Sequence, residues 1–151
     1  MRKILFRGKR IDNGEWVEGY FVHCKSQFDD ESGRTAEIIP HCSDRIYKGE
    51  YNSFDVFEVI LETVGQYTGL TDKNGTKIFE GDILKYQINI KTAIVGKIVF
   101  LCGAFVFESE ELDRECDIAF ATFADDEIAL PEDCIEVIGN IHDNPELLET
   151  A

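Results

Sequence analysis

Residues 68–86 read TGLTDKNGTKIFEGDILKY, and together with residues 137–148, VIGNIHDNPELL, they decide the fold of this chain. Both stretches are rich in glycine, asparagine and aspartate, which favour turns because they accept backbone angles or local hydrogen bonds that other residues do not. They are poor in side chains that carry out chemistry. The pair therefore predicts an architecture and does not predict a reaction.

Turn residues separate the apolar runs on both sides of these stretches. Asp12-Asn13-Gly14 suits a tight hairpin turn between predicted strands over 4–6 and 16–22. In the second of these strands, alternation places Trp16 and Tyr20 on one side and Val17 on the other. Further strands are expected over 36–40, 54–61, 63–70, 83–90, 92–101, 105–107 and 134–141. Their spacing is typical of successive antiparallel strands rather than of strand–helix–strand units.

The remaining segments are expected to be loops or short helices. The polar segments 25–35 and 43–53 are predicted to be loops. Residues 109–116 form either a short helix capped by Ser109 or an acidic loop, and residues 116–123 fit a strand or a helix. Asn144 and Pro145 are typical of the first positions of a helix. We predict a mostly β chain, one domain over residues 1–151, built as a curved antiparallel sheet or a small β-barrel with a short C-terminal helix.

The composition indicates a folded protein of the cytosol. A chain of 151 residues with 44% hydrophobic residues is long enough for a real core. No apolar run reaches the ~18 residues of a membrane span, and the basic N-terminus lacks the apolar stretch of a signal peptide. The five cysteines contain no CxxC pair and are best read as reduced, buried thiols. We therefore expect a cytoplasmic protein without a membrane partner.

The net charge of −15 is concentrated in the second half of the chain. From residue 105 onward the sequence has 15 acidic residues and one basic residue, Arg114. Such a surface repels phosphate, so nucleic acid is an unexpected partner. The charge suits a basic protein partner or, as the simpler interpretation, keeps the protein soluble. The densest acidic run is a candidate partner-binding site, either as a mimic of nucleic acid or as an ordinary solvated face. It consists of Glu108, Glu110, Glu111, Asp113, Glu115 and Asp117.

An ordered series of short motifs carries a family resemblance over nearly the whole chain. The motifs are the N-terminal strand at 3–7, NGEWVEG at 13–19, VGQYTGL at 64–70, DKNG at 72–75, IFEGDI at 78–83 and EVIGNIHDNPELL at 136–148. With these motifs the chain resembles the YopX-like proteins of phages and bacterial prophages. The resemblance implies a mostly β fold and expression inside a bacterial host. It implies no reaction, ligand or catalytic residue.

Two His-Cys pairs form the sharpest candidate for chemistry. His23, Cys24, His41 and Cys42 could supply four ligands to zinc. Adjacent side chains in a strand point to opposite faces, so each pair would offer one ligand unless the backbone bends. Buried thiols beside surface imidazoles are the structural alternative.

Three other groups combine a functional and a structural interpretation. His142-Asp143 could be a base with its orienting carboxylate, or could shape the turn before the last helix. Glu80 and Asp82, with Asp72 nearby, could bind a hard cation or stabilise turns. The N-terminal cations could contact nucleic acid beside the stacking surfaces of Phe6 and Trp16, or could lie on the solvent side of a terminal strand. The cations are Arg2, Lys3, Arg7, Lys9 and Arg10.

From these features we predict a non-enzymatic phage or prophage accessory protein that binds a host or phage protein and needs no cofactor. A small metal-dependent hydrolase using His23, His41 and His142 is one alternative, and an acidic inhibitor that mimics nucleic acid is another. The 11 phenylalanines also indicate a homo-oligomer, if some of them exceed the capacity of one core. The candidates for that contact are Phe105, Phe107, Phe120 and Phe123.

Overall fold

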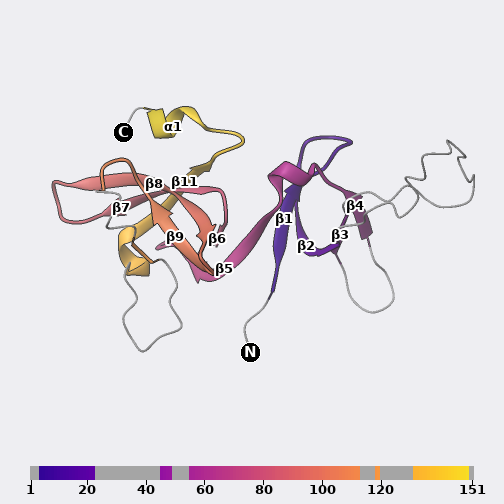
Figure 1. Ribbon diagram of the computed structural model, residues 1–151, viewed down its shortest axis with the longest axis horizontal. Coiled ribbons are helices and arrows are strands. Elements are labelled where there is room, and N and C mark those ends of the chain that lie inside the picture. Colours follow the sequence, from indigo (N-terminus) through magenta and orange to yellow (C-terminus); the bar gives the residue numbers. More distant parts are fainter. Residues whose placement is uncertain (1–3, 23–44, 49–54, 113–117, 120–130, 150–151) are drawn as a thin grey trace, which may run out of the picture. The chain divides into compact units, whose positions relative to one another are not determined.

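The computed structural model describes residues 4–22, 45–48, 55–112, 118–119 and 131–149 (Figure 1). The chain divides into two compact units, residues 5–64 and residues 65–151 with 1–4. The strands are β1 (Phe6–Lys9), β2 (Trp16–Val22), β3 (Arg45–Lys48), β4 (Asp55–Glu58), β5 (Gly65–Thr71), β6 (Lys77–Phe79), β7 (Asp82–Gln87), β8 (Ala93–Leu101), β9 (Ala104–Glu108), β10 (Ile118–Ala119) and β11 (Ile135–Asn140). The helices are the 3₁₀ turns η1 (Leu61–Thr63) and η2 (Glu132–Cys134) and the helix α1 (Glu146–Glu149).

The mostly β fold class is confirmed. All strand pairs within the two units are antiparallel, and the described sheets stay open rather than closing into a barrel. No helix in the described segments is long and apolar enough to cross a membrane. The prediction of one domain over residues 1–151 stays a prediction.

In the unit of residues 5–64, β1 to β4 form a meander in the order β4-β3-β2-β1. The predicted Asn-Gly hairpin is present, and it pairs Phe6 with Gly19 and Lys9 with Trp16. The predicted alternation along β2 is also confirmed, because Val17 is buried and Tyr20 is exposed. The inner face of this sheet forms a small core. Its members are Val17, Ile46 and Val59, with Phe21, Phe57 and Val64 packed against them.

The predicted loop over residues 43–53 is wrong for four residues. Arg45–Lys48 forms β3, which pairs with β2 on one side and β4 on the other. Only Ile46 in this strand is an aliphatic residue, and it is fully buried. One aliphatic residue in four gives no alternation to recognise, so the partners on both sides, rather than local propensity, define this strand.

In the unit of residues 65–151, β5 and β6 form a hairpin, and five strands form a sheet in the order β10-β9-β8-β7-β11. Strands β7, β8 and β9 follow one another as a meander, while β11 returns to pair with β7. The short helix α1 follows β11 and contacts β8, as the yellow ribbon in Figure 1 shows. The core contains Ile78, Leu84, Ile94, Ile98, Phe105, Phe107 and Ile135.

The two signature stretches meet at Asp72. Its Oδ1 accepts hydrogen bonds from the backbone amides of Asn74 (2.8 Å) and Thr76 (2.9 Å), which closes the predicted turn at 72–75. Its Oδ2 accepts the amide of Val137 at 3.0 Å, 65 positions along the chain. Burial by itself would raise the pKa of the Asp72 carboxyl, but the hydrogen bonds from the three amides lower it below its usual value. One carboxylate therefore ties the β5–β6 turn to the edge of β11.

Two glycines of the family motifs permit close approaches. A Cβ on Gly65 would lie 2.4 Å from the carbonyl oxygen of Glu80, and a Cβ on Gly139 would lie 2.6 Å from Oδ1 of Asn144. The first contact is with backbone, so position 65 requires glycine. At position 139 the neighbour is a side chain, and a Cβ there would displace Asn144.

The C-terminal expectations are confirmed with shifted boundaries. The strand expected over 134–141 is β11, and Pro145 directly precedes α1. Residues 109–112, the described part of the segment 109–116, form a turn in which the Leu112 amide donates to the Ser109 carbonyl at 3.2 Å. The short strand β10 falls within the segment 116–123 that the sequence left open. The segments expected at 25–35 and 36–40 lie outside the described residues.

Candidate functional site

The four zinc candidates lie outside the described residues. These are His23, Cys24, His41 and Cys42, so the zinc site stays a prediction. Across residues 4–22, 45–48, 55–112, 118–119 and 131–149, no three His, Cys, Asp or Glu side chains gather as a metal site would require.

His142 and Asp143 lie in the exposed turn between β11 and α1. Oδ1 of Asn140 accepts the amides of both residues, at 3.0 and 2.9 Å. The Asn140 side-chain amide in turn donates to Oδ2 of Asp143 at 2.9 Å. This geometry supports the turn-shaping interpretation of Asp143. The hydrolase alternative also needs His23 and His41, which are not described, and it stays a prediction.

The acids around Gly81 take part in the fold. The Asp82 side chain is almost fully buried at 1% exposure, and its Oδ2 accepts the Phe79 amide at 2.7 Å. Asp72 uses its oxygens for backbone amides in the same way. The turn interpretation of these acids is therefore the better one, because the carboxylates bind backbone groups of the chain itself.

The acidic candidate surface is described only in part. Glu108 ends β9, and its carboxylate lies 3.0 Å from the ammonium of Lys97, its cross-strand neighbour. Glu110 and Glu111 are exposed in the following turn. That turn is fixed by Ser109, whose hydroxyl donates to the carbonyl of Val95 at 2.6 Å. The other candidates, Asp113, Glu115 and Asp117, lie outside the described residues.

The phenylalanines considered for an oligomer contact divide in two. Phe105 and Phe107 are 2% and 0% exposed and belong to the core, which removes them from the candidates for a subunit contact, and the homo-oligomer stays a prediction. Phe120 and Phe123 lie outside the described residues. Any contact between copies has to use other apolar side chains or these two.

The outer face of the β1–β2 hairpin gathers aromatic and basic side chains. The Arg7 guanidinium lies 4.7 Å from the centre of the Trp16 ring, and the Lys9 ammonium lies 5.8 Å from it. Alternate residues of a strand lie on the same face, so Trp16, Glu18 and Tyr20 of β2 share this face of the sheet. Tyr20 remains 57% exposed. We call Arg7, Lys9, Trp16 and Tyr20 the aromatic–basic face. Alternation in the sequence predicted that Trp16 and Tyr20 lie on one side of β2. Arg7 and Lys9 lie on that side because of the register in which β1 pairs with β2.

Phe6 does not belong to this face. It packs against Phe21 with ring centres 5.7 Å apart, on the side of the sheet that carries Val17. The shared stacking surface of Phe6 and Trp16, considered from the sequence, is therefore not formed.

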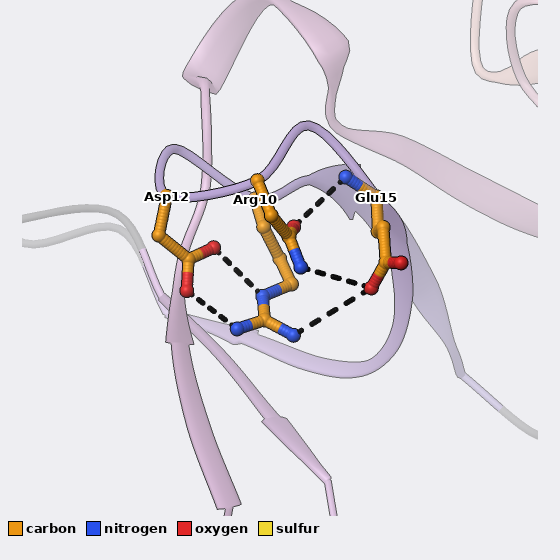
Figure 2. A network of polar contacts seen from close by, with 4 residues as sticks. Arg10, Asp12 and Glu15 are labelled. Atoms are coloured by element: carbon orange, nitrogen blue, oxygen red, sulfur yellow. Dashed lines mark hydrogen bonds and ion pairs between the residues drawn. The ribbon is translucent and has the colours of Figure 1, made fainter.

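A polar network fixes the turn that sets the register of this hairpin (Figure 2). Arg10 donates through Nε to Oδ1 of Asp12 at 2.9 Å and through Nη2 to Oδ2, while Glu15 lies on its other side. The Arg10 guanidinium also lies 4.4 Å from the centre of the Phe57 ring. The hydrogen bond between Arg10 and Asp12 lowers the pKa of Asp12 below its usual value and raises that of Arg10. The network thus supports the pairing of Lys9 with Trp16.

Comparison with known proteins identifies the family of this chain. A family model described as YopX protein matches residues 5–149. This chain belongs to the YopX family. The crystal structure of protein EF1440 from Enterococcus faecalis is similar, with 28% identity over 98% of this chain and 99% of that chain and a TM-score of 0.51. Comparison with curated proteins finds no match.

Membership of the YopX family confirms the resemblance read from the motifs. The matched residues include both signature stretches, whose described roles are the Asp72 contacts and the close approach at Gly139. Family membership therefore accounts for the architecture of the chain. A role has to be sought on the surface of this YopX-family protein.

Proposed function

We propose that this YopX-family chain is a non-enzymatic accessory protein of a phage or prophage that binds a host or phage protein. The observation that carries the proposal is the aromatic–basic face, where Trp16 lies against two cations on the same strand face as the exposed Tyr20. Trp, Tyr and Arg are the residues most often responsible for binding energy in protein interfaces. They occur here together on one sheet face.

The cations support this role by ordering the aromatic side chain before binding. A cation–π contact at an exposed site contributes about 0.5–1 kcal/mol, which favours one orientation of the Trp16 ring. A side chain that is already ordered loses less entropy when a partner binds. The sheet backbone below the face adds a rigid support.

Charge gives the proposed partner a chemical class. A net charge of −15 attracts a basic protein over long distances and accelerates encounter. Tyr20 and Trp16 then supply the short-range contact, supported by the cations that lie against the Trp16 ring. The protein expected here is basic overall.

Partner capture from a bacterial host lysate tests the proposal. Wild-type protein and Tyr20→Ala are immobilised in parallel, and the bound proteins are compared by quantitative mass spectrometry. Ile11→Ala is the matched control, because Ile11 is 58% exposed in the same unit but lies outside the aromatic–basic face. We expect Tyr20→Ala to lose a basic partner that wild type and Ile11→Ala retain, with affinity reduced about tenfold or more for the purified pair.

In this experiment, retention of every partner by Tyr20→Ala would exclude the aromatic–basic face as the binding site.

Two further measurements, of bound zinc and of salt dependence, separate the alternative functions. Stoichiometric zinc in protein purified without chelator would favour the hydrolase. If the partner binds through nucleic acid mimicry, its affinity falls steeply with added salt and depends on Glu110 and Glu111 rather than on Tyr20.

A further inference from the structure

The β7–β8 loop, residues 88–92, exposes apolar side chains that the described fold does not use. Ile88 is 49% exposed, and Ile90 is 100% exposed at the tip of the loop. A single exposed apolar residue is ordinary in a soluble protein. Two isoleucines within three residues are a small apolar surface, and their position at a tip makes them accessible to another molecule.

This loop is ordered by its own polar side chains. Oδ1 of Asn89 accepts the amides of Lys91 (2.9 Å) and Thr92 (3.0 Å). The Gln87 side-chain amide donates to the carbonyl of Thr92 at 3.2 Å, and the Ile88 amide donates to the same carbonyl at 3.0 Å. The isoleucines are therefore presented by a loop with a defined conformation, which lowers the entropic cost of binding.

The loop lies in a stretch of sequence whose charge is opposite to that of the whole chain. Residues 83–107 contain three lysines and no acidic residue, although the whole chain carries −15. Lys97 is paired with Glu108 in the middle of the sheet. Lys91 is exposed beside Ile90 at the tip. The tip is thus apolar and basic, and an acidic surface is its complement.

An acidic turn lies at the same end of the same sheet. Strand β9 runs antiparallel to β8 and ends at Glu108 opposite Lys97, so the chain after it continues toward the beginning of β8, where the β7–β8 loop ends. The Ser109 hydroxyl marks this level by bonding the Val95 carbonyl. The exposed Glu110 and Glu111 therefore follow a strand adjacent to the loop, and adjacent strands lie about 4.8 Å apart.

We infer that a second copy of this chain binds at this end of the sheet in a two-fold symmetric dimer. In such a dimer the same patch serves both partners, so it must contain both halves of each contact. Here Lys91 of one copy meets Glu110 and Glu111 of the other, the reverse contact forms at the same time, and the isoleucines pack between them. Two loops bury less than the roughly 800 Å² per partner of a standard interface, so the dimer is weak and depends on concentration.

The oligomeric state of the full chain tests this inference. Sedimentation equilibrium is measured from about 5 to 500 µM, a range in which a micromolar dimer dissociates. We expect wild-type protein to shift from monomer to dimer and Ile90→Asp to need at least about tenfold higher concentration, since a carboxylate replaces the central apolar contact. Ile11→Asp is the matched control, because it places the same charge at an exposed isoleucine of the other unit.

A charge exchange identifies the contact without relying on loss alone. Lys91→Glu and the pair Glu110→Lys with Glu111→Lys should each weaken the dimer, and their combination should restore it. A variant that only failed to fold could not be restored in this way. Tyr20→Ala should leave the dimer unchanged, which separates this inference from the proposed function.

The inference is overturned by any of three results. These are a monomer at every concentration, a dimer of unchanged strength in Ile90→Asp, or no restoration when the charges are exchanged. Binding of wild type to vesicles of anionic lipid, lost in Ile90→Asp without a protein dimer, would assign the loop to a membrane surface instead and would also overturn it.

Discussion

At the scale of single residues, Asp72 explains why a short polar motif can be decisive for a fold. Its carboxylate satisfies two amides of its own turn and the Val137 amide of a distant strand. Lys73 adds to this link, because its amide donates to the Ile135 carbonyl and its ammonium lies 2.6 Å from the Glu136 carboxylate. The outer edge of β11 is thereby covered, and a covered edge does not pair with other chains.

Asp72→Asn is expected to lower the free energy of unfolding by about 2 kcal/mol at about pH 7, since an amide group cannot accept three hydrogen bonds as a carboxylate does. The pKa of Asp72 is lowered in the folded state, so its contribution is complete above the unfolded pKa of about 3.9. The contribution is lost as the pH falls through the folded pKa. Urea unfolding of both proteins between about pH 7 and about pH 2 measures this.

In that comparison the two proteins should approach the same stability at the acidic end. A stability difference that stays constant over the whole pH range would show that the charge of Asp72 is not what binds the amides.

At the scale of elements, the turn of the β8–β9 hairpin places a cysteine, Cys102, in a backbone conformation that cysteine does not favour. Leu101 pairs with Ala104, so Cys102 and Gly103 form a two-residue turn. Both have positive φ angles, 51° and 84°, as the tight hairpin turn requires. Asparagine is favoured over cysteine at the first position, because its side chain tolerates this backbone region.

Cys102→Asn should therefore raise the free energy of unfolding by about 0.5 kcal/mol, since the exposed side chain makes way for one that tolerates the turn. Gly103→Ala is the matched control and should lower it by about 1 kcal/mol, because a Cβ is strained at φ 84°. Thermal unfolding in reducing buffer measures both changes. A Cys102→Asn protein less stable than wild type would contradict this account of the turn.

The elements also show how far the sequence alone leads. Alternation and turn residues predicted the β1–β2 hairpin, the turn after β5, the β7–β9 meander and the last strand and helix, because these signals are local. Strand β3 was missed because the buried Ile46 is the one aliphatic residue in the sequence of Arg45–Lys48. Its pairing with β2 and β4 depends on residues outside the strand, so the four residues of β3 alone do not predict it.

The candidate surfaces were less predictable for the same reason. Trp16 was expected on the outer face of β2, but its contacts with Arg7 and Lys9 depend on the pairing of β1 with β2. Likewise, the acidic run was visible in the sequence, while the ion pair of Glu108 with Lys97 depends on the register of β8 and β9. The strand register determines which charged residues become neighbours on the surface.

At the scale of the whole molecule, the buried acids of the family motifs are distinct from the exposed side chains of the candidate surfaces, although Arg7 and Trp16 lie within the motifs at 3–7 and 13–19. The signature acids Asp72 and Asp82 are buried and bind backbone amides, whereas Tyr20, Ile90 and Glu110 are exposed. A protein organised in this way can keep its fold while its exposed residues change. Within the described residues, this division supports a binding role with the signature as its scaffold.

The unfolding free energy of Asp82→Ala tests this division most directly. Removing the carboxylate leaves the buried Phe79 amide without its acceptor and leaves a cavity where the Asp82 carboxylate was. We therefore predict that the free energy of unfolding falls by about 2 kcal/mol or more. Wild-type stability in this variant would contradict the account, because a buried carboxylate that the fold does not need would be available for chemistry.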